Sequence, residues 1–94
     1  MDEETRARIS IILAEFDGRD VAIGDAGREN TKTVNRVARL VRLNLSGGEK
    51  TFRRNVAVYK VADSLETLEI GAERAGGGVW RLIARWTGTD APAL

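Results

Sequence analysis

The stretch TLEIGAERAGGGVWRLIARWT, residues 67–87, places two segments of alternating polar and apolar residues on either side of three consecutive glycines. A hairpin centred on Gly77 sets two oppositely charged pairs on one face: Glu73 with Arg81 and Glu69 with Arg85. The same register gives these further pairs: Thr67 with Thr87, Leu68 with Trp86, Ile70 with Ala84, Ala72 with Leu82, and Arg74 with Trp80. Such pairing is typical of a half-buried antiparallel ladder. We therefore predict a C-terminal hairpin over residues 67–87, with both tryptophans in the core beneath it. Stacking of the tryptophans on bases is the alternative, and it requires them to be exposed.

Two segments nearer the N-terminus predict a helix and a further strand. Residues 3–16 carry apolar side chains at helical spacing, with acids before them and Gly18 after them at a stop position. Residues 51–61 are rich in Val, Tyr, Phe and Thr, which favours a strand. Between these segments, residues 20–26 are short and contain Gly24, so a brief helix and an irregular loop remain equally open.

The segment from Thr31 to Leu45 favours a second helix. Its apolar side chains Val34, Val37 and Val41 fall on one helical face, opposite a basic face, and Gly47-Gly48 can end the helix. A strand is the alternative here, because several apolar residues of 37–45 also share one strand parity. The chain as a whole predicts an α+β fold with an antiparallel sheet of three or more strands. We expect one domain over residues 1–88 and a frayed tail over 89–94.

Positive charge is concentrated in the middle of the chain. Residues 30–62 hold eight basic side chains and one acid, a local charge of +7, whereas the whole chain has a net charge of +1. A concentrated positive stretch in a small chain is typical of proteins that bind polyanions. The sequence therefore indicates nucleic acid or an acidic protein surface as a partner, although a solvated basic helix face is the alternative.

Composition excludes several chemistries. The chain has no cysteine and no histidine, so it has no disulfide, none of the common zinc ligand sets and no catalytic Cys/His or Ser/His pair. No paired carboxylates stand at a spacing that predicts a shared site, so we expect neither an enzyme nor a cofactor. The longest apolar run is Ile11 to Ala14, too short for a membrane span or a secretory signal. We expect a cytoplasmic protein.

Residues 20–42 resemble the helix-turn-helix of lac-repressor-type DNA-binding domains. The resemblance is carried by Asp20-Val21-Ala22, Ala26-Gly27, Thr33-Val34 and Arg36-Val37, with two spacings each one residue longer than in the family. It implies two packed helices, the second facing the major groove, and in a winged variant a basic hairpin tip at Lys50 to Arg54. The residues expected to contact nucleic acid or an acidic partner are Lys32, Thr33, Asn35, Arg36, Arg39, Arg42, Lys50, Arg53 and Arg54.

Two glycine motifs look like nucleotide-binding loops. Leu45-Ser46-Gly47-Gly48-Glu49-Lys50 resembles the signature motif of ATP-binding-cassette and chromosome-maintenance ATPases. Those enzymes also need a Walker A loop and an acidic Walker B strand, which this chain lacks. The triple glycine at 76–78 is followed by neither a helix nor a Gly-Lys pattern, so it predicts a turn.

Three functions are consistent with the charge pattern and with the chemistries that the composition excludes. The first is non-catalytic nucleic-acid binding, for example by a DNA-binding regulator. The second is a phage-type inhibitor or other interaction protein that docks on an acidic surface of a host nucleoprotein complex. The third is a self-assembling module that uses its sheet edges, with a homodimer as its simplest form.

Overall fold

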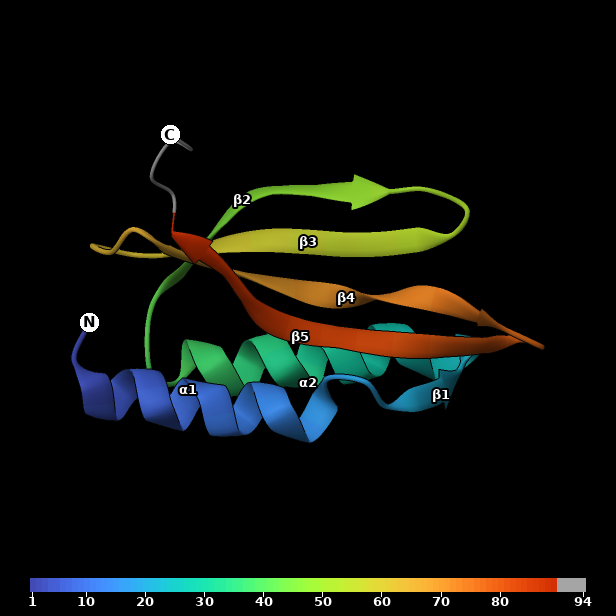
Figure 1. Cartoon of the computed structure of the whole chain (residues 1–94), viewed down its shortest axis with the longest axis horizontal. Coiled ribbons are helices and arrows are strands. Elements are labelled where there is room, and N and C mark those ends of the chain that lie inside the picture. The colour runs from blue at the N-terminus through green and yellow to red at the C-terminus, as the bar shows by residue number, and fades with distance from the viewer. Residues whose placement is uncertain (90–94) are drawn as a thin grey trace.

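The computed structural model describes residues 1–89 of the chain, and Figure 1 shows their arrangement. The elements in order are α1 (Glu3–Phe16), β1 (Asp20–Ala22), a 3₁₀ turn (Ile23–Asp25), α2 (Ala26–Ala38), β2 (Leu43–Lys50), β3 (Arg54–Val61), β4 (Glu66–Gly76) and β5 (Val79–Thr89). All strand pairs are antiparallel, and the sheet order is β1-β5-β4-β3-β2. The predicted α+β fold, with an N-terminal helix and C-terminal strands, is confirmed. The tail predicted for residues 89–94 lies, from Asp90 onward, outside the described residues.

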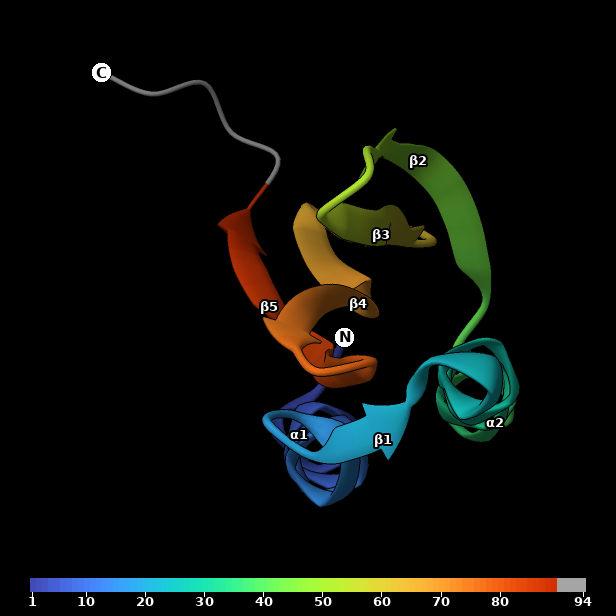
Figure 2. The ribbon, with the colours of Figure 1, turned by 90° about the vertical axis from the view of Figure 1, so that its right-hand side faces the viewer.

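The helices cover one half of the sheet. α1 packs against β5 and α2, and α2 packs against β4 and β5. Figures 1 and 2 both show α1 beside β5 and β2 at the opposite side of the molecule. The half of the sheet formed by β2 and β3 therefore extends beyond α1. No helix within residues 1–89 is long and apolar enough to cross a membrane.

Local sequence determines where α1 begins and ends. The Asp2 carboxylate accepts a hydrogen bond from the Thr5 backbone N–H at 2.7 Å, which caps the first turn. The helix buries its apolar side chains at helical spacing: Ile9, Ile12, Leu13 and Phe16. Gly18 follows with φ of 80°, a conformation that glycine adopts without steric cost, so the chain can leave the helix there.

The C-terminal hairpin has the predicted register from Leu68 to Arg74. A bulge then places Thr67 opposite Gly88 rather than Thr87, although the hydroxyl groups of Thr67 and Thr87 still form a hydrogen bond. The three glycines of the turn all have positive φ. The two tryptophans are half-buried against the core, and the indole N–H of Trp86 donates to Ser10 Oγ at 3.0 Å.

The helix predicted from Thr31 to Leu45 is right up to Ala38 and wrong beyond it. Residues 43–50 form β2, in which Leu43 pairs with Val61 and Leu45 with Tyr59. Pairing with β3 outweighs the helical spacing of a few apolar residues, because β3 supplies backbone hydrogen-bond partners and cross-strand side-chain contacts along one edge of β2. Gly47 and Gly48 consequently lie inside a strand rather than at the end of a helix.

Residues 20–42, which resemble a helix-turn-helix, contain one α-helix in this structure. The first segment of the resemblance forms β1, where Asp20 pairs with Arg81 and Val21 with Trp80. Without β1, the backbone N–H and C=O groups on the side of β5 that faces away from β4 would lack partners. A short strand can pair with these groups, whereas a helical turn uses its own backbone groups internally. The first helix that the resemblance implies is therefore replaced by a strand and a 3₁₀ turn.

Candidate nucleic-acid interface

The basic face of α2 borders an open groove where this helix meets the end of α1. Its lining residues come from α1, from the loop before β1 and from α2: Phe16, Arg19, Glu29, Lys32, Asn35, Arg36 and Arg39. The groove has a volume of about 500 Å³. We call it the helix groove. It contains four of the predicted contact residues, all on α2 or directly after it.

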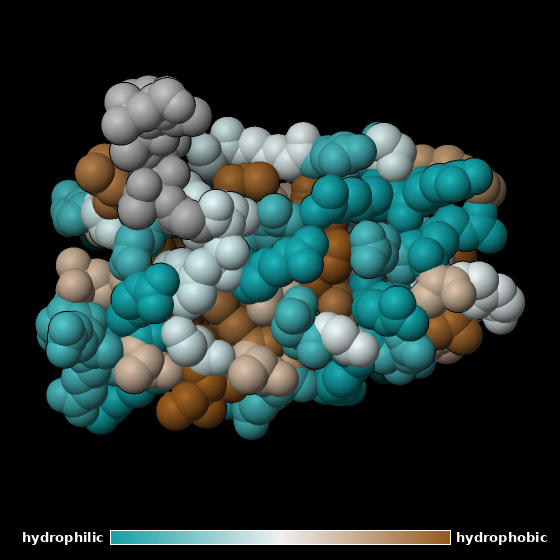
Figure 3. Space-filling view, in the orientation of Figure 1, coloured by the Kyte–Doolittle hydropathy of each residue, from teal (hydrophilic) through white to brown (hydrophobic). Residues whose placement is uncertain are grey.

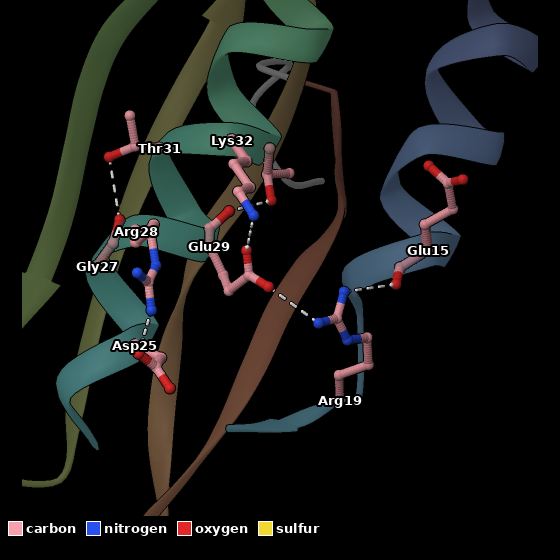
Figure 4. Close-up of polar contacts among 9 residues, drawn as sticks. Glu15, Arg19, Asp25, Gly27, Arg28, Glu29, Thr31 and Lys32 are labelled. Carbon is pink, nitrogen blue, oxygen red and sulfur yellow. Dashed lines mark hydrogen bonds and ion pairs between the residues drawn. The ribbon is translucent and has the colours of Figure 1, made fainter. Parts of the chain in front are cut away.

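Two carboxylates form ion pairs with three of the four cations of the helix groove, which are Arg19, Lys32, Arg36 and Arg39. Glu29 accepts from Arg19 at 3.0 Å and pairs with the Lys32 ammonium at 3.3 Å, as Figure 4 shows. Arg36 forms an ion pair with Glu15 of α1. For Arg39, no carboxylate within residues 1–89 lies in ion-pairing distance. Four cations against two carboxylates leave the groove with an excess of two positive charges.

Phe16 holds two of the guanidinium groups in place. Its ring is 5% exposed, and the guanidinium carbons of Arg19 and Arg36 lie 5.6 and 5.7 Å from the ring centroid. Cations prefer such positions over an aromatic face. Arg19 also approaches the Glu15 backbone carbonyl at 3.5 Å, which connects the end of α1 to Glu29 on α2. These contacts restrict the side chains while leaving further N–H donors on each guanidinium open to a ligand.

Glu29 is ionised in this arrangement. Burial of its side chain, which is 14% exposed, acts to raise its pKa, but the hydrogen bonds and charges of Lys32 and Arg19 outweigh that effect. The pKa of Glu29 therefore lies below its ordinary value. At neutral pH its negative charge positions both cations.

Thr33 is not available to a nucleic acid. It is among the residues expected to contact nucleic acid or an acidic partner, but its side chain is buried at 1% exposure beneath α2. Its hydroxyl group donates to the Glu29 backbone carbonyl at 2.8 Å, one helical turn earlier. Thr33 therefore belongs to the inner face of the helix, and its role in binding is withdrawn.

The remaining predicted cations do not join the helix groove. Arg42 immediately precedes β2, whereas Lys50 and Arg53 lie at the turn between β2 and β3, at the other end of the molecule in Figure 1. The eight residues of β2 span about 26 Å at the usual strand rise. Arg54 is paired with Glu69 at 2.7 Å and with Glu49 at 3.8 Å. The basic middle of the sequence is thus divided between two ends of the fold.

The turn between β2 and β3 combines an exposed aromatic ring with basic side chains. The Thr51 hydroxyl accepts hydrogen bonds from the backbone N–H groups of Arg53 and Arg54, at 3.2 and 2.9 Å. Phe52 is 79% exposed, and the Arg74 guanidinium carbon lies 4.3 Å from its ring centroid. This tip therefore presents an aromatic ring among cations, beside a groove of about 310 Å³ lined by Phe52 and Arg53 of the turn and by Arg74 and Gly76 of β4.

Figure 3 shows that hydrophilic residues dominate the face of the molecule seen in Figure 1, with hydrophobic residues in scattered groups. No family model, curated protein or solved structure matches the chain.

Sequence reasoning missed the residues that complete the helix groove. Arg19, Phe16 and Glu15 come from the end of α1 and the loop after it, outside the basic middle of the sequence. Only the spacing of Glu29 and Lys32, one helical turn apart, could have indicated an ion pair. The approach of Arg19 to α2 depends on the packing of the two helices.

Proposed function

We propose that this chain is a small non-catalytic binding protein of the cytoplasm that contacts nucleic acid through the helix groove. The observation that supports the proposal is the gathering of four cations around one groove, where their ion pairs involve two carboxylates, Glu29 in the lining and Glu15 of α1. The cations are Arg19, Lys32, Arg36 and Arg39. Sequence-independent binding to nucleic acid depends mainly on such cations, which neutralise phosphates and release counterions.

The chemistry of the groove suits phosphate oxygens. Guanidinium groups donate in a planar fork, and the two that lie over Phe16 are already restricted, so less side-chain freedom is lost on binding. Asn35 on the same side of α2 adds an amide that can donate or accept. For duplex DNA, log K falls by roughly 0.9 per log unit of salt for each phosphate that the protein neutralises. An excess of two positive charges in the groove therefore predicts a slope of about −2.

The test is the binding of a short fluorescently labelled DNA duplex, followed by anisotropy at several salt concentrations. Arg36→Ala with Arg39→Ala should weaken binding by about tenfold and flatten the salt dependence. Lys50→Ala with Arg53→Ala is the matched control, because it removes the same charge at the other end of the fold. Circular dichroism establishes that both variants are folded.

Two results would contradict the proposal. One is the absence of DNA binding at low salt, and the other is an equal loss of affinity in both double variants. If DNA does not bind while an acidic protein is retained after nuclease treatment, the helix groove is a docking surface for that protein instead.

A further inference from the structure

A second groove lies on the other side of α2, between this helix and the sheet. It is lined by asparagines Asn30 and Asn35 of α2 and Asn55 of β3, by Tyr59 of β3, and by apolar side chains including Val34 and Ile70. Its volume is about 250 Å³. We call it the amide groove.

Four of the polar side chains that line the amide groove have no hydrogen-bond partner among the described side chains and backbone: Asn30, Asn35, Asn55 and Tyr59. The fifth, Thr31, donates its hydroxyl to the Gly27 backbone carbonyl at 3.0 Å. Each amide offers two donors and an acceptor oxygen. Three amides that converge on an apolar floor match a flat ligand with donors and acceptors on its edge. Asparagine is a frequent partner of base edges for that reason.

The volume limits the size of this ligand. Pockets for drug-sized molecules occupy about 300–1,000 Å³, so the amide groove is suited to a smaller group such as one heterocyclic base. A base inside a duplex is stacked on both faces and cannot enter a groove between a helix and a sheet. The ligand must therefore be an unpaired base from a single strand.

Asn35 lines both the amide groove and the helix groove. A nucleotide lying across Asn35 would have its base among the amides and its phosphate beside Lys32 and Arg36. We propose that the amide groove binds one unstacked base of a single-stranded nucleic acid whose phosphates are held in the helix groove. This inference rests on the proposed function and adds to it a preference for single strands over duplexes.

The experiment compares two labelled strands of equal length and charge, an oligothymidine and a strand in which every base is absent. The base-containing strand should bind about tenfold more tightly, because base contacts add to phosphate contacts. Asn55→Ala should lower its affinity to that of the abasic strand and leave abasic binding unchanged. Asn30→Ala, on the opposite wall, should act in the same direction.

Asn44→Ala provides the matched control, since Asn44 is an exposed asparagine of β2 that does not line the amide groove. It should preserve the preference for the base-containing strand. Thermal unfolding followed by circular dichroism verifies that each variant is folded.

The outcomes separate this inference from the function on which it rests. Equal affinity of the unchanged protein for both strands would overturn the base site, while the proposed function would stand if Arg36→Ala with Arg39→Ala weakened both. Failure to bind either strand at low salt would overturn both proposals. Displacement of the oligothymidine by polyglutamate, with no preference for bases, would also overturn the base site and indicate an acidic protein partner.

Discussion

The carboxylate of Asp17 accepts a hydrogen bond from the backbone N–H of Ala84 at 2.9 Å. Asp17 directly follows α1, and Ala84 lies in β5 beyond the end of its pairing with β1. Backbone hydrogen bonds continue beside it, since Gly18 donates to Leu82 at 2.9 Å and Leu82 donates to Arg19 at 2.8 Å. Asp17 therefore extends the edge pairing with a side chain and fixes the end of α1 against the sheet.

Replacement of Asp17 tests that role. Asp17→Ala leaves the N–H of Ala84, a residue only 2% exposed, without its partner, so the free energy of unfolding should fall by about 1–3 kcal/mol. Asp17→Asn keeps an acceptor oxygen at the same position and should cost less. Urea denaturation measures both variants. Equal losses would show that the carboxylate charge, rather than the hydrogen bond, is what matters.

The adjacent glycines of β2 should respond differently to alanine. A Cβ atom at Gly48 would lie 2.6 Å from the Val56 carbonyl oxygen and 3.1 Å from the Ala57 Cα, both of them backbone atoms. A Cβ atom at Gly47 would meet no atom within 4 Å. Gly48→Ala should therefore lower stability by about 1–3 kcal/mol, whereas Gly47→Ala should be tolerated. Similar denaturation midpoints for the two variants would contradict the close approach of β2 and β3.

The same two glycines illustrate what sequence can and cannot predict. The C-terminal hairpin was predictable because its partners lie close in sequence and each charged or apolar pair supports the same register. Gly47-Gly48 looked like a helix stop because nothing local shows that β3 will pair with β2. Whether such a segment becomes a helix or a strand depends on the tertiary fold, which determines whether a neighbouring strand is available for pairing.

In the candidate site, too, features set by local spacing were predictable, whereas contacts between different elements were not. The basic face of α2 was predictable from its spacing, since Lys32, Arg36 and Arg39 recur on one side. The ion pair of Arg36 with Glu15 was not, because Glu15 belongs to another helix. Thr33 was expected among the contact residues together with the helix-turn-helix resemblance, but its hydroxyl donates to a backbone carbonyl within the helix and the side chain is buried.

Stability should decrease in acid through Glu29. Its pKa in the folded protein lies below the ordinary value of 4.5, so the carboxylate contributes stability that is fully present above pH 4.5. That contribution is lost as the pH falls through the lower folded-state pKa, where the folded protein also takes up the proton. Glu29→Gln should therefore be less stable than the unchanged protein at neutral pH, and the difference should shrink in acid.

Urea midpoints measured from neutral pH down to acid pH test this dependence. Asp2, whose pKa is lowered by its hydrogen bond from the Thr5 backbone N–H, contributes in the same direction and is present in both proteins. The comparison of the two curves thus isolates Glu29. A difference that stays constant with pH would contradict the assignment.

Glu29→Gln should also change the affinity for nucleic acid, in the direction opposite to its effect on stability. The substitution removes a carboxylate from the helix groove and releases Arg19 and Lys32 from their ion pairs. The positive excess rises from two to three charges, so single-stranded DNA should bind about threefold to tenfold more tightly at low salt, with a steeper salt dependence. Fluorescence anisotropy at neutral pH and low temperature measures this on the folded variant.

Glu66→Gln is the matched control for that experiment. Glu66 pairs with Arg6 at 2.6 Å and does not line the helix groove, so its replacement changes the net charge equally but at another site. We expect a smaller gain in affinity, because charges farther away than a Debye length of about 10 Å are screened. Weaker binding by Glu29→Gln would mean that positioning of Arg19 and Lys32 by Glu29 outweighs its repulsion of phosphate. An equal gain in both variants would instead place the nucleic acid outside the helix groove.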